Sequence, residues 1–217
     1  MIATPALIDL LAANAGPVRR LRPPTVRALL WLLFAGFVLA LLALGHGTRP
    51  DLALRLSEPL FVVGMAACLA TGILAIVASF MLNVPDRSRG WVLLPVPALI
   101  VWVSTIGYGC LTHWVEIGPD GMHAGDTARC FATLMLTSLP LSLALLSMLR
   151  NGSLLHPTAA TFTASLAVAA ITASTMLLIH DLNATVMILL WNVGAATAIV
   201  VAGGAAAAIR RSLGRTA

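Results

Sequence analysis

Six long apolar runs, none with a charged residue in its interior, constrain the fold of this chain more than any other feature of the sequence. A helix that crosses the hydrocarbon core of a membrane, about 30 Å thick, needs about 20 apolar residues, and each run has roughly that length. None of the runs alternates apolar and polar residues as a strand of a membrane barrel does. The runs are, approximately, residues 27–45, 59–82, 91–112, 130–149, 159–179 and 184–208. The sequence therefore predicts an all-α, polytopic membrane protein with six transmembrane helices.

The overall composition agrees with this class of protein and excludes others. Apolar residues make up 59% of the chain and charged residues 10%, whereas a soluble domain has about 45–50% and about 25%. An ordinary soluble enzyme, a disordered chain and a disulfide-stapled secreted module are thereby excluded. The segments between the runs are too short for a second domain. We expect a leader of residues 1–26, one transmembrane domain of residues 27–209 and a tail of residues 210–217.

The positions of the arginines predict the orientation of the chain. All 13 basic residues are arginines, and cytoplasmic segments of membrane proteins carry an excess of such residues. If the N-terminus is cytoplasmic, the outer loops hold only Arg49, Arg55 and Arg129. The inner segments then hold Arg19, Arg20, Arg22, Arg27, Arg87, Arg89, Arg150, Arg210, Arg211 and Arg215. We therefore expect both termini in the cytoplasm of a bacterial cell, with the multi-pass chain in the inner membrane.

The net charge of +5 does not indicate a nucleic-acid-binding protein. The arginines flank apolar runs, and no basic cluster is interleaved with aromatic residues as in a nucleic-acid interface. We therefore expect contact with membrane lipid and no direct contact with nucleic acid.

Small and hydroxyl-bearing residues share one helix face in each of three runs, and in the first of these they recur at spacings of three and four. Such stripes allow close helix packing in a membrane, and hydroxyls there bond to a backbone carbonyl one turn back or to a neighbouring helix. Packing is therefore the favoured interpretation, and Cys68 belongs to it. The stripes are Gly64, Cys68, Gly72, Ala75 and Ser79; Cys130, Thr133, Thr137 and Ser138; and Thr161, Ser165, Thr172 and Thr175.

Residues that carry catalysis or transport are scarce in the runs. No ionisable side chain lies in the middle of a run, although pumps and channels depend on such residues. Asn192 is the most polar residue in a run and suits a structural hydrogen bond, while Pro95, Pro97 and Pro140 are expected to bend their helices. A disulfide-generating enzyme would need a reactive cysteine pair, typically Cys-x-x-Cys, which is missing. We expect no enzymatic activity, and a small-solute transporter or channel stays as the alternative function.

Cysteine and histidine residues collect on the predicted outer face. Thiolate and imidazole groups bind soft and borderline metal ions, and an accessible thiol is a target for oxidants. The spacing matches no compact zinc motif, so the residues indicate no firmly bound cofactor, and a transient metal ion at the periplasmic face stays open. A disulfide between Cys110 and Cys130 is also open, because the periplasm is oxidising. The residues concerned are His46, Cys110, His113, His123, Cys130, His180 and Asp181.

The leader combines a short apolar segment with a basic strip. Leu7, Ile8, Leu10 and Leu11 predict a short helix that ends at Gly16 and Pro17. About ten residues do not form a stable helix alone in water. The segment therefore either lies on the membrane or folds into the groove of a partner protein.

Several short motifs, taken together and in order, resemble the NrsF family, a six-helix membrane domain. The leader carries the first two motifs, and the others follow along almost the whole chain. They are Leu7-Ile8-Asp9-Leu10-Leu11, Pro17-Val18-Arg19-Arg20-Leu21, Arg129-Cys130, Leu139-Pro140, Arg150-Asn151-Gly152, His156-Pro157, His180 and Trp191.

The resemblance implies a membrane-bound anti-sigma factor whose leader captures a cytoplasmic extracytoplasmic-function (ECF) sigma factor through its two motifs. It also implies that periplasmic thiols register oxidant or heavy-metal stress, with Cys130 as the sensing thiol. The family often has a second cysteine where this chain has Asp181. Three alternatives therefore stay open: Cys110 is the partner of Cys130, His180 and Asp181 bind metal, or Cys130 acts alone through a sulfenic acid.

Overall fold

The computed structural model describes residues 22–47, 50–84, 87–112, 124–150 and 157–179, together with Thr4, Ala13 and Gly194. Within these ranges the regular structure is entirely helical. Five of the described helical segments are long and apolar enough to cross a membrane. The all-α fold with apolar helices of membrane-spanning length is therefore confirmed for the described residues. The sixth predicted span, residues 184–208, lies outside the described ranges except for Gly194, and so do nearly all of the leader and the whole tail.

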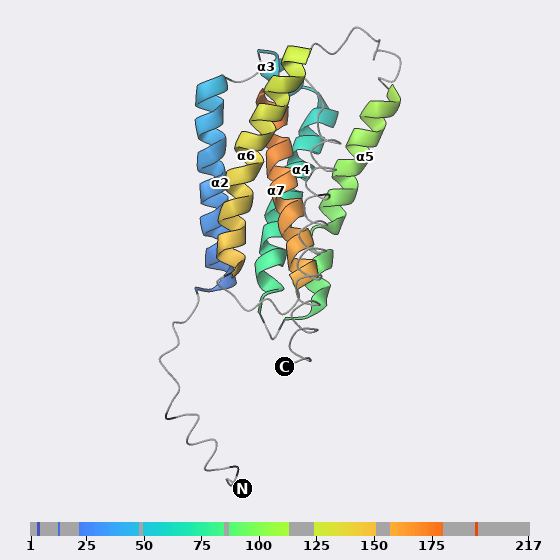
Figure 1. Ribbon diagram of the computed structural model, residues 1–217. Coiled ribbons are helices and arrows are strands. Elements are labelled where there is room, and N and C mark those ends of the chain that lie inside the picture. Colours follow the sequence, from blue (N-terminus) through green and yellow to red (C-terminus); the bar gives the residue numbers. More distant parts are fainter. Residues whose placement is uncertain are drawn as a thin grey trace, which may run out of the picture.

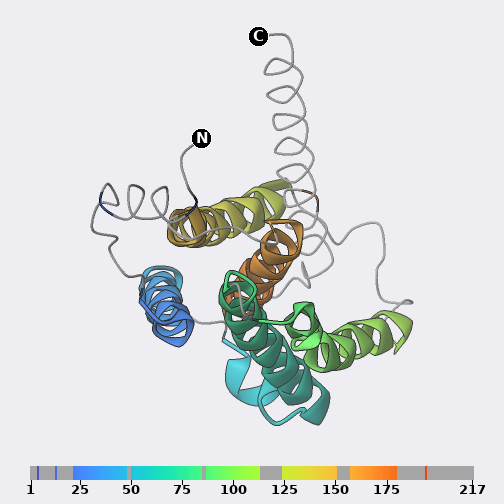
Figure 2. The same ribbon diagram turned by 90° about the horizontal axis from the view of Figure 1, so that it is seen from below.

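The five long helices stand side by side as a bundle (Figures 1 and 2). We call the end where α2 begins and α4 ends the lower end, and the opposite end, which carries α3, the upper end (Figure 1). Helix α7 is the most enclosed, with 67% of its span buried, and α5 the least, with 11%. The described elements are α2 (Pro24–His46), α3 (Leu52–Arg55), α4 (Pro59–Met81), the 3-10 turn η1 (Arg89–Leu93), α5 (Val96–Thr112), α6 (Ala124–Arg150) and α7 (Pro157–Ile179).

The contact between α4 and α7 is the most extensive among the described helices, and small residues line it. A Cβ atom placed on Gly72 would lie 3.0 Å from Cδ1 of Ile171 on α7. Further down, the Ser79 hydroxyl donates a hydrogen bond of 3.2 Å to the carbonyl of Ala160. Nearer the upper end the same stripe meets α5, where a Cβ on Gly64 would lie 3.1 Å from Oγ1 of Thr105. The predicted small-residue packing face is confirmed.

Hydroxyl groups inside the bundle mostly bond within their own helices, as predicted. Thr137 donates to the carbonyl of Thr133 at 2.7 Å, and Thr175 donates to the carbonyl of Ile171 at 2.9 Å. Thr172 differs, because among the described residues its buried hydroxyl has no partner. The hydroxyls of Thr137 and Thr175 are thus satisfied within their own helices, as expected of packing residues.

Three helix boundaries differ from the predicted ones. Helix α6 begins at Ala124 rather than near residue 130, because hydropathy marks the part of a helix inside the membrane and not the turns beyond it. Helix α2 begins at Pro24, three residues before the predicted start, at a residue suited to the first helical position. Pro95 lies between η1 and α5, and Pro97 is the second residue of α5. These two prolines mark a helix start instead of bending an interior, whereas Pro140 does lie inside α6.

Candidate functional site

The two predicted sensing thiols belong to the ends of α5 and α6 that lie at the upper end of the bundle. Cys110 lies in the last turn of α5, and Cys130 is the seventh residue of α6, inside its second turn. The predicted metal ligands His113, His123, His180 and Asp181 lie outside the described residues. So do the predicted sigma-binding residues Leu7, Ile8, Asp9, Leu10, Leu11, Pro17, Val18, Arg19, Arg20 and Leu21.

The helices that carry Cys110 and Cys130 are not neighbours in the bundle. Both views place α7 between α5 and α6 (Figures 1 and 2). A disulfide requires Cα atoms within about 7 Å of each other. The arrangement of the described helices thus gives no support to a disulfide between Cys110 and Cys130, and their pairing stays a prediction. Within the described ranges, no three histidine, cysteine or acidic residues are grouped so as to hold a metal ion.

Charges at the upper end are paired with each other on the surface. The Arg55 side chain lies 3.5 Å from a carboxylate oxygen of Asp51 and 3.2 Å from one of Glu58. All three side chains are exposed, so each pair contributes at most about 1 kcal/mol. The two carboxylates therefore neutralise the positive charge of Arg55 at this end.

Cys68 is a packing residue and not an accessible thiol. Its side chain is fully buried between α4 and α7. The thiol donates to the carbonyl of Ala170 at 3.1 Å and accepts a hydrogen bond of 3.3 Å from the hydroxyl of Ser174. Reaction with a reagent would require the α4–α7 contact to open, so Cys68 is unsuited to sensing.

A second polar feature joins α2 to α6 in the lower half of the bundle. The guanidinium of Arg27 donates from Nη2 to the carbonyl of Met148 and lies 4.7 Å from the ring centroid of Phe80. One turn later on α2, the buried indole of Trp31 donates to the carbonyl of Leu141 at 3.2 Å. We call these four residues, Arg27, Trp31, Leu141 and Met148, the α2–α6 seam.

Arg27 does more than mark orientation. Only 9% of the residue is exposed, although it is charged, and among the described residues no carboxylate pairs with it. Its charge is compensated by the carbonyl of Met148 and by the face of the Phe80 ring, as a buried guanidinium requires. The sequence pattern missed this role, because an arginine ahead of an apolar run is also typical of a surface residue.

Asn83, just past the end of α4, was also missed. It is 6% exposed, and neither Nδ2 nor Oδ1 has a hydrogen-bond partner in the described part of the chain. An asparagine after an apolar run normally indicates a solvated turn, so the sequence carries no signal for its burial.

Comparison with known families gives one match over nearly the whole length of the chain. The model of the NrsF family, described as negative regulator of sigma F, matches residues 11–213. Comparison with curated proteins and with solved structures gives no match.

Proposed function

Because the chain belongs to the NrsF family of negative regulators of a sigma factor, we propose that it is an anti-sigma factor of the bacterial inner membrane that sequesters an ECF sigma factor. The observation that carries the proposal is the extent of the match. It begins at residue 11, within the leader, and continues through all five described membrane helices. The match thus includes residues 11–26 of the leader, with the second motif, as well as the bundle.

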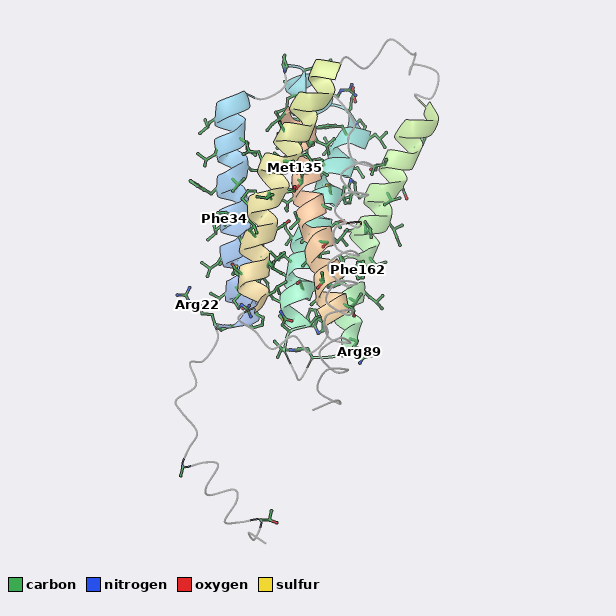
Figure 3. The ribbon with its side chains drawn as sticks, viewed as in Figure 1. Arg22, Phe34, Arg89, Met135 and Phe162 are labelled. Carbon is green, nitrogen blue, oxygen red and sulfur yellow. The ribbon has the colours of Figure 1, made fainter. Side chains whose placement is uncertain are left out.

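The lower end of the bundle is assigned to the cytoplasm. Arg22 and Arg89 lie at this end (Figure 3), as do Arg27 at the start of α2 and Arg87 beside η1. At the upper end, Arg55 is paired with carboxylates. This distribution agrees with the positive-inside rule, and it places the start of α2 in the compartment where sigma factors act.

The leader is assigned the capture of the sigma factor. Its two apolar and basic motifs, residues 7–11 and 17–21, are too short to fold alone and suit binding in the groove of a partner. Its connection to the start of α2 keeps it close to the lower end. Capture thus occurs beside the bundle, where the helices are able to influence it.

Release is assigned to chemistry at Cys130. Since α5 and α6 lie on different sides of α7, we favour a thiol that acts without Cys110. Hypochlorite converts a thiol to a sulfenic acid with loss of HCl, so that sulfur is oxidised by two electrons and chlorine is reduced by two. Helix α6 is continuous from Ala124 to Arg150, so a change in its second turn has a direct path to the lower end.

The test uses the full chain in lipid nanodiscs and purified ECF sigma factors of the same organism, each assayed in turn. Capture is measured by surface-immobilised binding before and after addition of hypochlorite or cadmium. We expect the parent chain to bind and then to release the sigma factor. Removal of residues 1–21 should abolish capture, and retained capture would contradict the role of the leader.

Cysteine variants separate the sensing residue from a general oxidation effect. Cys130→Ser should capture the sigma factor and fail to release it, whereas Cys110→Ser, the matched control on α5, should release it as the parent does. Release by Cys130→Ser at the parental oxidant concentration would contradict the sensing role. Failure of Cys110→Ser to release would instead indicate a disulfide between the two.

A further inference from the structure

We propose that Arg27 and Trp31 are positioning residues for sigma-factor capture: they fix α2 on α6 and thereby set the pose in which the leader meets the sigma factor. This inference rests on the proposed function, because it assigns a regulatory role to the helix from which the leader emerges.

The two hydrogen-bond donors on α2, Arg27 and Trp31, are coupled to the backbone of α6. Arg27 and Trp31 are one turn apart on α2, and they donate to the carbonyls of Met148 and Leu141, which are seven residues and therefore about two turns apart on α6. Both acceptors belong to the main chain, so no rotamer change on α6 moves them separately. A rotation or translation of α6 displaces both acceptors together.

Helix α2 lies at the edge of the bundle. Only 22% of its span is buried, compared with 67% for α7, and large side chains such as Leu33 and Phe37 are exposed. Its packed face carries Trp31, Leu42 and two alanines, and it contacts α4 as well as α6. In the described part of the chain, the side-chain hydrogen bonds from α2 to other helices go to the main chain of α6, so these directional bonds set the register of α2 on α6.

Arg27 has two ways to respond when its acceptor on α6 moves. A buried guanidinium must keep acceptors, since an unpaired charge in an apolar environment costs several kcal/mol. If the carbonyl of Met148 moves away, either α2 follows or Arg27 moves to water at the lower end. Such a choice between two arrangements is typical of switching elements in packed helices.

The start of α2 sets the direction in which the chain enters the helix from the leader. Pro23 and Pro24 have φ angles restricted by their rings, and Pro23 is extended, with φ −50° and ψ 145°. The amide of Arg27 donates to the carbonyl of Pro23 at 3.1 Å. The residues that join the leader to α2 are thus tied to the same turn that carries Arg27.

The test measures the affinity of the full chain in nanodiscs for the sigma factor. Trp31→Phe keeps an aromatic ring and removes only the N–H donor and part of the ring area. We expect its Kd to rise about tenfold, within the usual range of coupling between sites. Trp102→Phe is the matched control, because Trp102 is equally buried but lies on α5. Its Kd should remain that of the parent.

A second pair of variants tests the charged half of the seam. Arg27→Gln should raise the Kd at least as much as Trp31→Phe, whereas Arg89→Gln should leave it unchanged, because Arg89 is exposed at the same end. Thermal unfolding of all four variants is recorded in parallel. Similar losses of stability in Trp31→Phe and Trp102→Phe, with weaker capture only in the former, would support the positioning role.

The outcomes distinguish the inference from the function on which it rests. A parent chain that does not bind the sigma factor contradicts the proposed function and removes the premise. A parent that binds, with Trp31→Phe and Arg27→Gln binding equally tightly, overturns the positioning role alone. Equal weakening by Trp31→Phe and Trp102→Phe also overturns it, because the effect would then follow general loosening of the bundle.

Discussion

The contacts of α4 with α7 and of α2 with α6 both hold two helices together, but through different interactions. Between α4 and α7, small side chains bring the backbones close, and a Cβ atom on Gly72 would lie only 3.0 Å from Ile171. Between α2 and α6, two long side chains donate to backbone carbonyls. Close packing has one good arrangement, because a shift of either helix creates clashes or voids. The two hydrogen bonds hold α2 in one register while their acceptors stay in place, and they carry α2 along when α6 moves. We infer that the first contact is the fixed frame and the second the adjustable one.

The largest effect on stability is expected from Gly72→Leu, which places a branched side chain where even a Cβ atom would lie 3.0 Å from Cδ1 of Ile171. Overpacking of this kind costs about 1–3 kcal/mol or more, and here the neighbour is Ile171 on the most enclosed helix. Thermal unfolding in detergent measures the loss. Gly36→Leu is the control, because a Cβ on Gly36 of α2 meets nothing within 4 Å. Equal destabilisation by the two variants would contradict a tight α4–α7 frame.

A smaller effect is expected from Trp31→Phe, which removes one buried hydrogen bond of the α2–α6 seam. Such a bond contributes about 1 kcal/mol, so the midpoint of thermal unfolding should fall less than in Gly72→Leu. The carbonyl of Leu141 keeps its bond within α6, which limits the loss. A fall as large as that of Gly72→Leu would show that the seam is part of the frame.

The smallest effect is expected from Ser79→Ala, which removes the hydrogen bond from α4 to the carbonyl of Ala160 on α7. Hydrogen bonds between membrane helices contribute about 0.6 kcal/mol on average, and the small residues around Ser79 keep the helices together without it. Ser104→Ala is the control, since the exposed Ser104 hydroxyl bonds only within α5, to Ile100. If Ser79→Ala destabilised the chain more than Trp31→Phe, hydrogen bonding rather than packing would dominate the α4–α7 contact.

The sequence predicted the α4–α7 contact better than the α2–α6 contact, for a physical reason. Small residues at spacings of three and four define a helix face regardless of the partner, so Cys68 and Gly72 were correctly assigned to packing. The role of Arg27 depends on which carbonyl lies opposite, and a main-chain carbonyl leaves no mark in the sequence. The burial of Asn83 likewise depends on neighbours that are distant in the chain.

The site was predicted less completely than the fold. The helices that carry Cys110 and Cys130 were predicted from hydropathy, but not that α7 separates them, because hydropathy gives the order of helices and not their arrangement. The start of α6 was placed six residues too late for a related reason. Residues 124–129 include Asp126 and Arg129, and charged residues are compatible with a helix once it has left the membrane.

The central claim is that the position of α2 on α6 governs capture of the sigma factor. It is tested most directly by comparing the motion of α2 relative to α6 with that of α4 relative to α7. If the position of α2 on α6 governs capture, then by linkage the bound sigma factor must act back on that position. Spin labels are attached to cysteines introduced at the exposed positions Leu33 and Leu143 for α2 and α6, or Ile73 and Phe162 for α4 and α7. The chain also carries Cys110→Ser and Cys130→Ser, and Cys68 is retained because it is buried.

Pulsed electron paramagnetic resonance then gives the distance distribution of each pair with and without the sigma factor. We expect that binding of the sigma factor shifts or narrows the distance distribution between α2 and α6 and leaves the distribution between α4 and α7 unchanged. Unchanged distributions for both pairs when the sigma factor is bound, or equal shifts in both, would contradict the central claim.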